Sequence, residues 1–232
     1  MTNTSILAAF ERMWQHVINK LSGKADIDHT HDGFMTTENP TGIGSLSMNR
    51  KADTTVGDYS STMGYDCEAS GGYSHAEGGY TTASGDYAHA EGFDTDAIGY
   101  ASHAEGGLTT SSSDYTHAEG YKTTASGKYS HAEGYETTAS KLYSHSEGYR
   151  TLASSNYQHV QGKYNIEDAS NIYAHIVGNG ENSSNRSNAH TVDWDGNAWY
   201  QGTIKVGGTS YDDASEVALK SDVSGVTIVR WE

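Results

Sequence analysis

Hydrophobic residues near the start of the chain recur at steps of three and four positions. They are Leu7, Phe10, Met13, Trp14, Val17, Ile18 and Leu21. This period places them on one side of an α-helix, so the pattern predicts a helix over residues 5–22. A lone helix of this length is marginal in water, and its apolar side therefore needs a partner, either a short coiled coil or another protein. Residues 23–58 break the pattern and contain the only proline, Pro40, which predicts a connector.

From residue 59 the pattern changes to a tandem repeat with a period of 14 residues. The histidines that mark the period are His75, His89, His103, His117, His131, His145 and His159. A weaker copy occupies 59–72, and a last one at 173–178 follows a two-residue slip. Self-similarity at a fixed period indicates stacked supersecondary units, each of which depends on its neighbours.

Each repeat fits one rung of two short strands joined by two tight turns. Alternate residues of a strand face opposite ways, so Ala76 and Ala83, with their copies in the other repeats, are predicted to fill a narrow interior. Glycines are expected to supply the positive φ angles at the turns. The predicted fold is all-β, a parallel β-solenoid with 14-residue rungs. Eight or nine rungs stacked at about 4.8 Å would be roughly 40 Å long.

The same alternation places a histidine and a glutamate of each rung together on the outer face. This predicted row contains His75, Glu77, His89, Glu91, His103, Glu105, His117, Glu119, His131, Glu133, His145, Glu147 and His159. A face that only meets water needs no particular residue type, so the constant row indicates that something covers it. Our first hypothesis is a ladder of His–Glu hydrogen bonds between copies of the chain. The alternatives are a solvated outer face and a row of metal or anion sites.

Composition narrows the class of protein. Hydrophobic residues make up only 34% of the chain, with 27 glycines and 17 tyrosines, which does not suit a conventional core. The formal net charge of -16 argues against binding to nucleic acid. The single cysteine, Cys67, excludes an intrachain disulfide. The sequence shows no convincing signal peptide and no segment suited to membrane insertion.

After residue 178 the repeat gives way to shorter β patterns. A hairpin is expected around 191–200 with its turn at Asp195-Gly196-Asn197, followed by a strand ending at Val206. A short helix near 212–221 and a last strand at 225–231 are also expected. Aromatic residues gather here and are candidate receptor contacts, since aromatic faces hold sugars; the alternative is that they form the core of a cap. They are Trp194, Trp199, Tyr200 and Tyr211.

The repeat resembles the head domain of trimeric autotransporter adhesins over residues 59–178. The family frame of Ser-Val-Ala-Ile-Gly, followed by a Ser/Ala-rich half, is matched here by Ser74-His75-Ala76-Glu77-Gly78 and its copies. The resemblance implies a left-handed parallel β-roll in a threefold trimer. His75 and Glu77 replace two apolar residues that the resemblance would place against the other chains. The short helix, the Asp-His-Thr-His connector and residues 187–208 also resemble tail-fibre or receptor-binding proteins of bacteriophages.

The resemblance implies four parts in a homotrimeric fibre. These are an attachment or trimerisation helix at 1–22, a connector at 23–58, the β-roll at 59–178 and a C-terminal β cap or tip at 179–232. Such a protein would belong to a virion tail, with a baseplate or tail protein at its N-terminus and a host-surface glycan or protein as its receptor. It would not be an enzyme. A purely structural spacer and a bacterial adhesin head are the alternatives, although the adhesin would need a signal peptide and a membrane anchor, which the chain does not show.

His29 and His31 form a separate His-x-His motif in the connector. On a strand both rings point the same way, so three chains around an axis would offer six nitrogens, an octahedral set for Fe, Zn or Ni. Phage fibres of the kind that the chain resembles use such a site to join their chains. The alternative is an ordinary polar linker.

Overall fold

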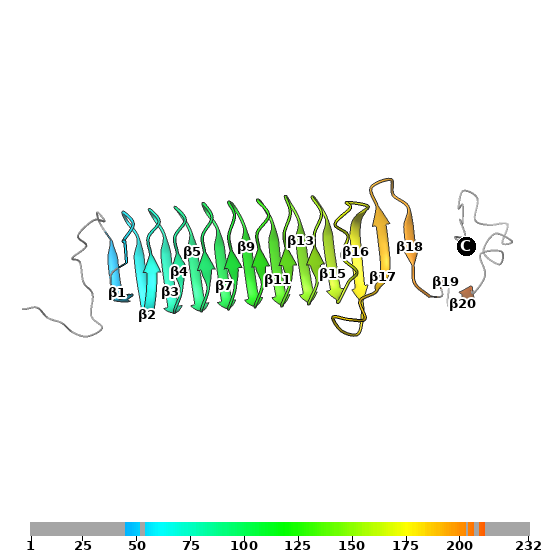
Figure 1. Ribbon diagram of the computed structural model, residues 1–232, viewed down its shortest axis with the longest axis horizontal. Coiled ribbons are helices and arrows are strands. Elements are labelled where there is room, and N and C mark those ends of the chain that lie inside the picture. Colours follow the sequence, from blue (N-terminus) through cyan, green and yellow to red (C-terminus); the bar gives the residue numbers. More distant parts are fainter. Residues whose placement is uncertain (1–44, 52–53, 203, 207–208, 212–232) are drawn as a thin grey trace, which may run out of the picture.

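The computed structural model describes residues 45–51, 54–202, 204–206 and 209–211. The predicted helix at 5–22, the His29/His31 motif and the elements expected at 212–221 and 225–231 lie outside these residues. The described part is a rod whose strands run across its long axis, from β1 at one end to β18 near the other (Figure 1).

The rod is a parallel β-solenoid of about nine turns, as the repeat predicted. It begins with β1 (Leu46–Arg50), inside the segment predicted as a connector, and β2 (Ser61–Ala69), which pair in parallel. Each following rung has a five-residue strand and a two-residue strand, except the rung of β15, which has only the five-residue strand. These strands are β3 (His75–Gly79), β4 (Thr82–Ala83), β5 (His89–Phe93), β6 (Asp96–Ala97), β7 (His103–Gly107), β8 (Thr110–Ser111), β9 (His117–Tyr121), β10 (Thr124–Ala125), β11 (His131–Tyr135), β12 (Thr138–Ala139), β13 (His145–Tyr149), β14 (Leu152–Ala153) and β15 (His159–Lys163). The strand β16 (Tyr173–Asn179) closes the parallel stack.

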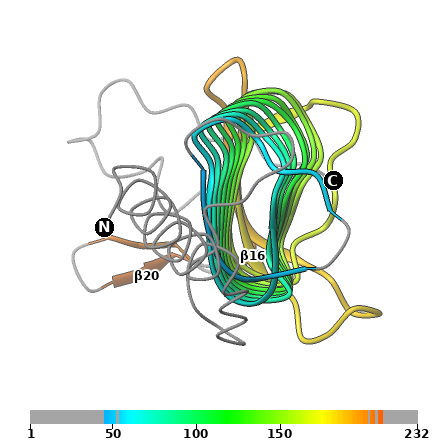
Figure 2. The same ribbon diagram turned by 90° about the vertical axis from the view of Figure 1, so that its left-hand side faces the viewer.

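Equivalent residues of successive rungs lie directly above one another. In the five-residue strands His103 pairs with His117, and in the two-residue strands Thr124 pairs with Thr138. Seen end-on, the rungs superpose as a narrow flattened tube (Figure 2). Because of this register, the side chains at equivalent positions of successive rungs form columns that run along the rod.

The interior of the tube is filled by small side chains. The alanines predicted to point inward, among them Ala76, Ala83, Ala104 and Ala125, are fully buried. A column of threonines that the sequence did not single out is buried with them: Thr81, Thr95, Thr109, Thr123, Thr137 and Thr151. Alanine and threonine together fill the tube, and the equivalent of Thr81 one rung earlier is the free thiol Cys67.

The glycines act differently from the prediction. Gly78 and its copies do have positive φ, but they lie inside the five-residue strands. Gly85 has no positive φ; a side chain there would overlap the backbone of Gly99 in the next rung. The left-handed turn positions are held instead by other residues, notably tyrosines such as Tyr73 and Tyr129. These tyrosines therefore lie at the corners of the rungs.

Buried polar side chains end the stack of two-residue strands after β14. In an ordinary rung the Thr138 N–H donates to the Thr151 carbonyl at 2.9 Å. At the last such strand the Leu152 N–H donates to Asn165 Oδ1 at 2.8 Å, and Asn165 Nδ2 donates to the Leu152 carbonyl at 3.0 Å. The Asn165 side-chain amide thus replaces the peptide group of a further rung.

Gln158 and Asp168 extend this plug. The Ser154 N–H donates to Gln158 Oε1 at 3.0 Å, and Gln158 Nε2 donates to Asp168 Oδ2 at 3.1 Å. Asp168 Oδ2 also accepts the Tyr173 N–H at 2.7 Å, which ties the plug to β16.

Antiparallel strands follow the solenoid. The strands β17 (Asn188–Asp193) and β18 (Ala198–Tyr200) form the predicted hairpin, and β17 pairs with β16. The Asp193 carboxylate organises the turn by accepting the N–H groups of Asp195 and Asn197 at 3.0 and 2.7 Å. A separate pair, β19 (Ile204–Val206) and β20 (Thr209–Tyr211), includes the strand predicted to end at Val206.

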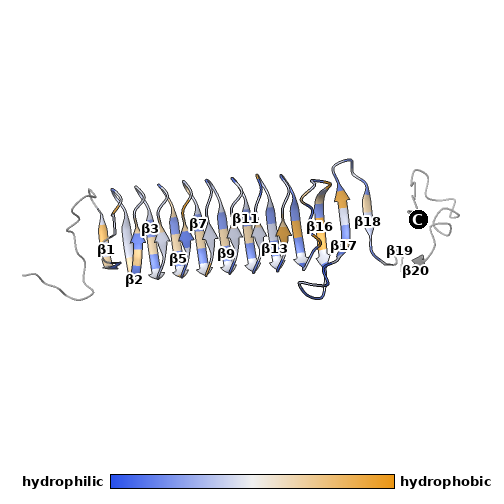
Figure 3. Cartoon of the chain, in the orientation of Figure 1, coloured by the Kyte–Doolittle hydropathy of each residue, from blue (hydrophilic) through white to orange (hydrophobic). Residues whose placement is uncertain are grey.

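Colouring by hydropathy shows blue, hydrophilic bands recurring on successive strands of the rod (Figure 3). The described part of the chain contains no helix long and apolar enough to cross a membrane. The rod is therefore held together mainly by backbone pairing and by small buried side chains, as its low hydrophobic content requires.

Candidate functional site: the His–Glu face

The predicted row of histidines and glutamates forms one face of the rod, which we call the His–Glu face. It consists of the outward side chains from His75 and Glu77 on β3 to His145 and Glu147 on β13, with His159 on β15. In the pairs that approach each other, side chains retain between 31% and 51% of their exposure. The structure thus brings all thirteen predicted ladder residues into one row, while pairing between chains stays a prediction.

The histidine rings stack on one another along this face. From His89 to His159 successive ring centroids lie 4.6–4.7 Å apart, and most neighbouring planes are nearly parallel. At the start of the row, Ser61 Oγ and His75 Nδ1 are hydrogen-bonded at 2.5 Å. Each ring therefore packs against the rings of the neighbouring rungs.

The glutamates lie beside the rings without good hydrogen bonds to most of them. The His75 Nε2–Glu77 Oε2 distance is 3.3 Å, but it grows to 3.7–4.0 Å in the four pairs from His89/Glu91 to His131/Glu133. Glu147 instead approaches His159 of the next rung at 3.4 Å. Five of the ring nitrogens are buried and have no hydrogen-bond partner within the described part of the chain: Nε2 of His103, His117, His131, His145 and His159.

Burial favours the neutral form of the rings. It is the main cause that lowers the pKa of His103, His131 and His145, and the neighbouring histidines lower it further. The nearby glutamates act in the opposite direction but do not outweigh these effects. At neutral pH these rings therefore cannot neutralise the negative charges beside them.

Three groups on this face have ligand atoms close enough to hold a metal ion. Within each group the imidazole nitrogens and carboxylate oxygens lie within 4.8 Å of one another. The groups are His103/Glu105/His117, Glu119/His131/Glu133 and His145/Glu147/His159. Neutral imidazole and carboxylate are suitable ligands for divalent transition metals.

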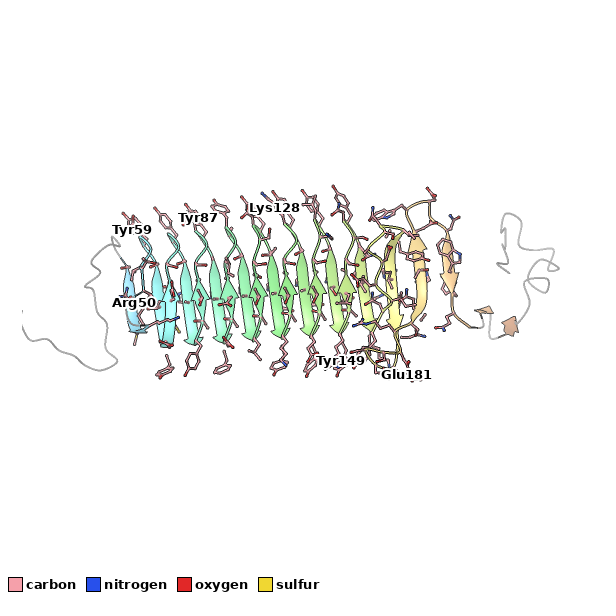
Figure 4. The ribbon with its side chains drawn as sticks, viewed as in Figure 1. Arg50, Tyr59, Tyr87, Lys128, Tyr149 and Glu181 are labelled. Atoms are coloured by element: carbon pink, nitrogen blue, oxygen red, sulfur yellow. The ribbon has the colours of Figure 1, made fainter. Side chains whose placement is uncertain are left out.

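Exposed tyrosines run along two edges of the rod, marked by Tyr59 and Tyr87 on one edge and Tyr149 on the opposite edge (Figure 4). The first column continues through Tyr115, Tyr129, Tyr143 and Tyr157. Most of its rings stack face to face at 4.8–5.2 Å, so their faces are already occupied by neighbours. The column therefore stabilises the stack and offers mainly ring edges and hydroxyl groups to other molecules.

The candidate receptor aromatics do not form one surface. The Trp199 ring packs edge-on against Tyr173 at 5.7 Å, whereas Tyr200 stacks on His190 at 4.4 Å. Adjacent residues of a strand point to opposite faces, which separates these two rings. Trp194 and Tyr200 are exposed, and Tyr211 lies in β20 with a side chain outside the described set.

No protein family, curated protein or solved structure matches this chain in comparisons with known proteins. The fold and the face define the class of molecule: a rod-like parallel β-solenoid of about nine turns with a continuous row of stacked histidines and glutamates. Sequence reasoning found this row through its period. It missed the buried threonine column and the Asn165 plug, although the recurring Thr at the start of each second half was a usable signal.

Proposed function

We propose that the chain is a homotrimeric fibre of a phage tail or a phage-derived particle, with its His–Glu faces turned toward one another at the trimer axis. The glutamate row carries this proposal. Glu77, Glu91, Glu105, Glu119, Glu133 and Glu147 stand one above another at rung spacing. Like charges about 5 Å apart repel, so such a row persists only where a partner compensates it.

Comparison with another column on the surface strengthens the argument. The left-handed turn position five residues after each repeat histidine holds a different residue in each of six successive rungs, so the repeat does not by itself keep a surface position constant. These residues are Tyr80, Asp94, Leu108, Lys122, Glu136 and Arg150. Within the described part, no lysine or arginine forms an ion pair with the glutamate row. Histidines of a neighbouring chain are the donors that this face would meet in a trimer.

The mass of the intact chain in solution tests the trimer. Sedimentation equilibrium should give three times 24.9 kDa. Reversing the charge at three rungs with Glu105→Lys, Glu119→Lys and Glu133→Lys should dissociate the trimer, because donors of the neighbouring chain would then face ammonium groups. The matched control, Thr110→Lys, Thr124→Lys and Thr138→Lys, changes the same rungs on the other side and should stay trimeric. A monomeric wild-type chain would overturn the proposal.

We further propose that the fibre recognises a host-surface glycan through exposed aromatics at its C-terminal end. Trp194 and Tyr200 are exposed there, and an aromatic face bound to a sugar excludes water from both. A glycan array with the intact protein should give specific binding. Trp194→Ala and Tyr200→Ala should abolish this binding and leave the oligomeric state unchanged. The control is Phe93→Ala, which removes an exposed aromatic ring on the rod itself. Absence of binding to any glycan would favour the structural spacer.

A further inference from the structure

The His–Glu face carries negative charge that its own side chains do not balance. Each of six rungs adds one glutamate to a single row, and within the described part of the chain no lysine or arginine pairs with that row. A cation bound within the face would remove the repulsion between successive glutamates.

The ring nitrogens are the second observation. Nε2 of His103, His117, His145 and His159 is buried without a hydrogen bond in the described structure. Buried polar atoms normally have a partner, so each such nitrogen calls for an explanation. The nearest carboxylate oxygens, 4.0 Å from His103 Nε2 and 3.4 Å from His159 Nε2, are positioned around these nitrogens but do not bond them well.

We propose that the His–Glu face binds divalent transition-metal ions such as Zn²⁺, each held by two histidines of successive rungs and one glutamate. The two sites with this ligand set are His103/Glu105/His117 and His145/Glu147/His159. Two imidazoles and a carboxylate leave a fourth position of a tetrahedral ion for water or a further ligand.

The ligand atoms of each site need to move only a short distance toward one another to hold an ion. Ligand atoms in each group now lie within 4.8 Å of one another. Metal–ligand bonds of about 2.1 Å place tetrahedral ligands roughly 3.4 Å apart. Side-chain rotation of partly exposed histidine and glutamate can supply this difference without moving the backbone, which holds adjacent rungs in fixed register.

The sites use ligands of one chain, so this inference goes beyond the proposed trimer and does not depend on it. The intervening group, Glu119/His131/Glu133, has one imidazole and two carboxylates and is a weaker candidate for Zn²⁺. It lies between the other two groups along the rod.

Direct metal titration tests the proposal on the full-length chain, purified without a histidine tag and stripped with a chelator. All variants carry His29→Gln and His31→Gln, so the separate His-x-His motif cannot contribute. Zn²⁺ is titrated by calorimetry, and Co²⁺ is followed by its visible absorption, which is intense for tetrahedral sites. We expect at least two ions per chain, one for each site with two histidines.

The decisive variant is His117→Gln with His159→Gln, which removes one imidazole from each site. Loss of a residue that only hydrogen-bonds a metal ligand lowers metal affinity by about 10- to 100-fold. Loss of a ligand itself should lower the Zn²⁺ affinity of these sites by more than that, and the tetrahedral Co²⁺ spectrum should disappear. The matched control is His190→Gln, because its Nε2 is also buried and unbonded but belongs to neither site. It should bind like the parent.

Equal binding by the double variant and the parent would overturn the inference, as would absence of binding by the parent. Sedimentation of the same samples separates this result from the proposed function. A metal-free trimer that binds no ion would refute the metal sites alone, and a metal-binding monomer would refute the trimer alone.

Discussion

Thr123 and Thr151 occupy the same buried place in two rungs, but their hydroxyl groups differ. Thr123 Oγ1 has no partner in the described structure, whereas Thr151 Oγ1 donates to the Glu147 carbonyl at 3.0 Å and lies 2.8 Å from Ser146 Oγ. A buried hydroxyl costs free energy unless it is bonded. The same residue type therefore opposes the fold at one rung and supports it at the other.

Valine in place of each threonine tests this difference. Thr123→Val keeps the side-chain shape and removes an unpaired polar atom, so it should leave the free energy of unfolding unchanged or raise it by about 1 kcal/mol. Thr151→Val removes a bonded hydroxyl and leaves partners unpaired, so it should lower that free energy by about 1–3 kcal/mol. Urea denaturation of both variants gives the comparison. Equal losses at both sites would show that Thr123 also has a partner.

The plug formed by Asn165 is the feature on which the last rungs depend. Its amide is bonded to both backbone groups of Leu152, so Asn165→Leu would leave a buried N–H and a buried carbonyl without partners. The expected loss is about 1–3 kcal/mol for each group.

Stacked repeats lose structure from the affected end, so the loss should concentrate in β14 and its neighbours. Hydrogen exchange at the Leu152 amide measures it. Asn156→Leu, at an exposed position nearby, should change stability by no more than about 0.5 kcal/mol. Undiminished protection of Leu152 in Asn165→Leu would contradict the role of the plug.

The hairpin β17–β18 should loosen in acid because of Asp193. The Asn197 side-chain amide, at 2.9 Å, is the main cause that lowers the pKa of this carboxyl, and backbone N–H groups of the turn lower it further. A group whose pKa falls on folding stabilises the fold above its unfolded value, here 3.8, and loses that contribution as the pH drops below it.

The protection factor of the Asn197 amide should therefore be constant from neutral pH down to this value and then decline. Asp193→Asn keeps an acceptor oxygen but cannot titrate, so its protection should not decline in that range. A parallel decline in the variant would assign the effect to another group.

The period of the repeat determined how much of these elements was predictable. Alternation at His75, Ala76 and Glu77 follows from strand geometry alone, and the interior alanines and the outer row were predicted from it. Thr81 lies two residues before the inward Ala83, so the same alternation could have placed the threonine column in the interior. Tyrosine at a left-handed position is unfavourable by itself and becomes understandable only when the stacked rings of other rungs are seen. Asn165 lies where the repeat lapses, and no period could identify its role.

At the scale of the whole molecule, the rod should tolerate a deletion only where the deletion keeps the register between rungs. Removing residues 117–130 joins Thr116 to His131 and deletes one complete rung. All remaining columns keep their partners, so the protein should fold and shorten by about 4.8 Å.

Removing residues 117–129 deletes one residue fewer and should abolish the fold beyond the junction. Ser130 would then occupy the place of a histidine, and every later strand would turn its alanines outward. Circular dichroism and small-angle scattering distinguish the two outcomes. A folded product from both deletions would mean that the register is not fixed by the buried columns.

The plug at the end of β14 also closes the stack of two-residue strands. Each rung presents to the next a backbone pattern identical to its own, and an uncovered final rung would recruit a strand from any other molecule with the same repeat. Asn165 and Gln158 bond to these backbone groups through their side-chain amides. A side-chain amide, unlike a strand, offers no row of backbone groups to a further strand. For this stack the two residues act as chain stoppers, because they leave no strand edge on which an amyloid-like filament could grow.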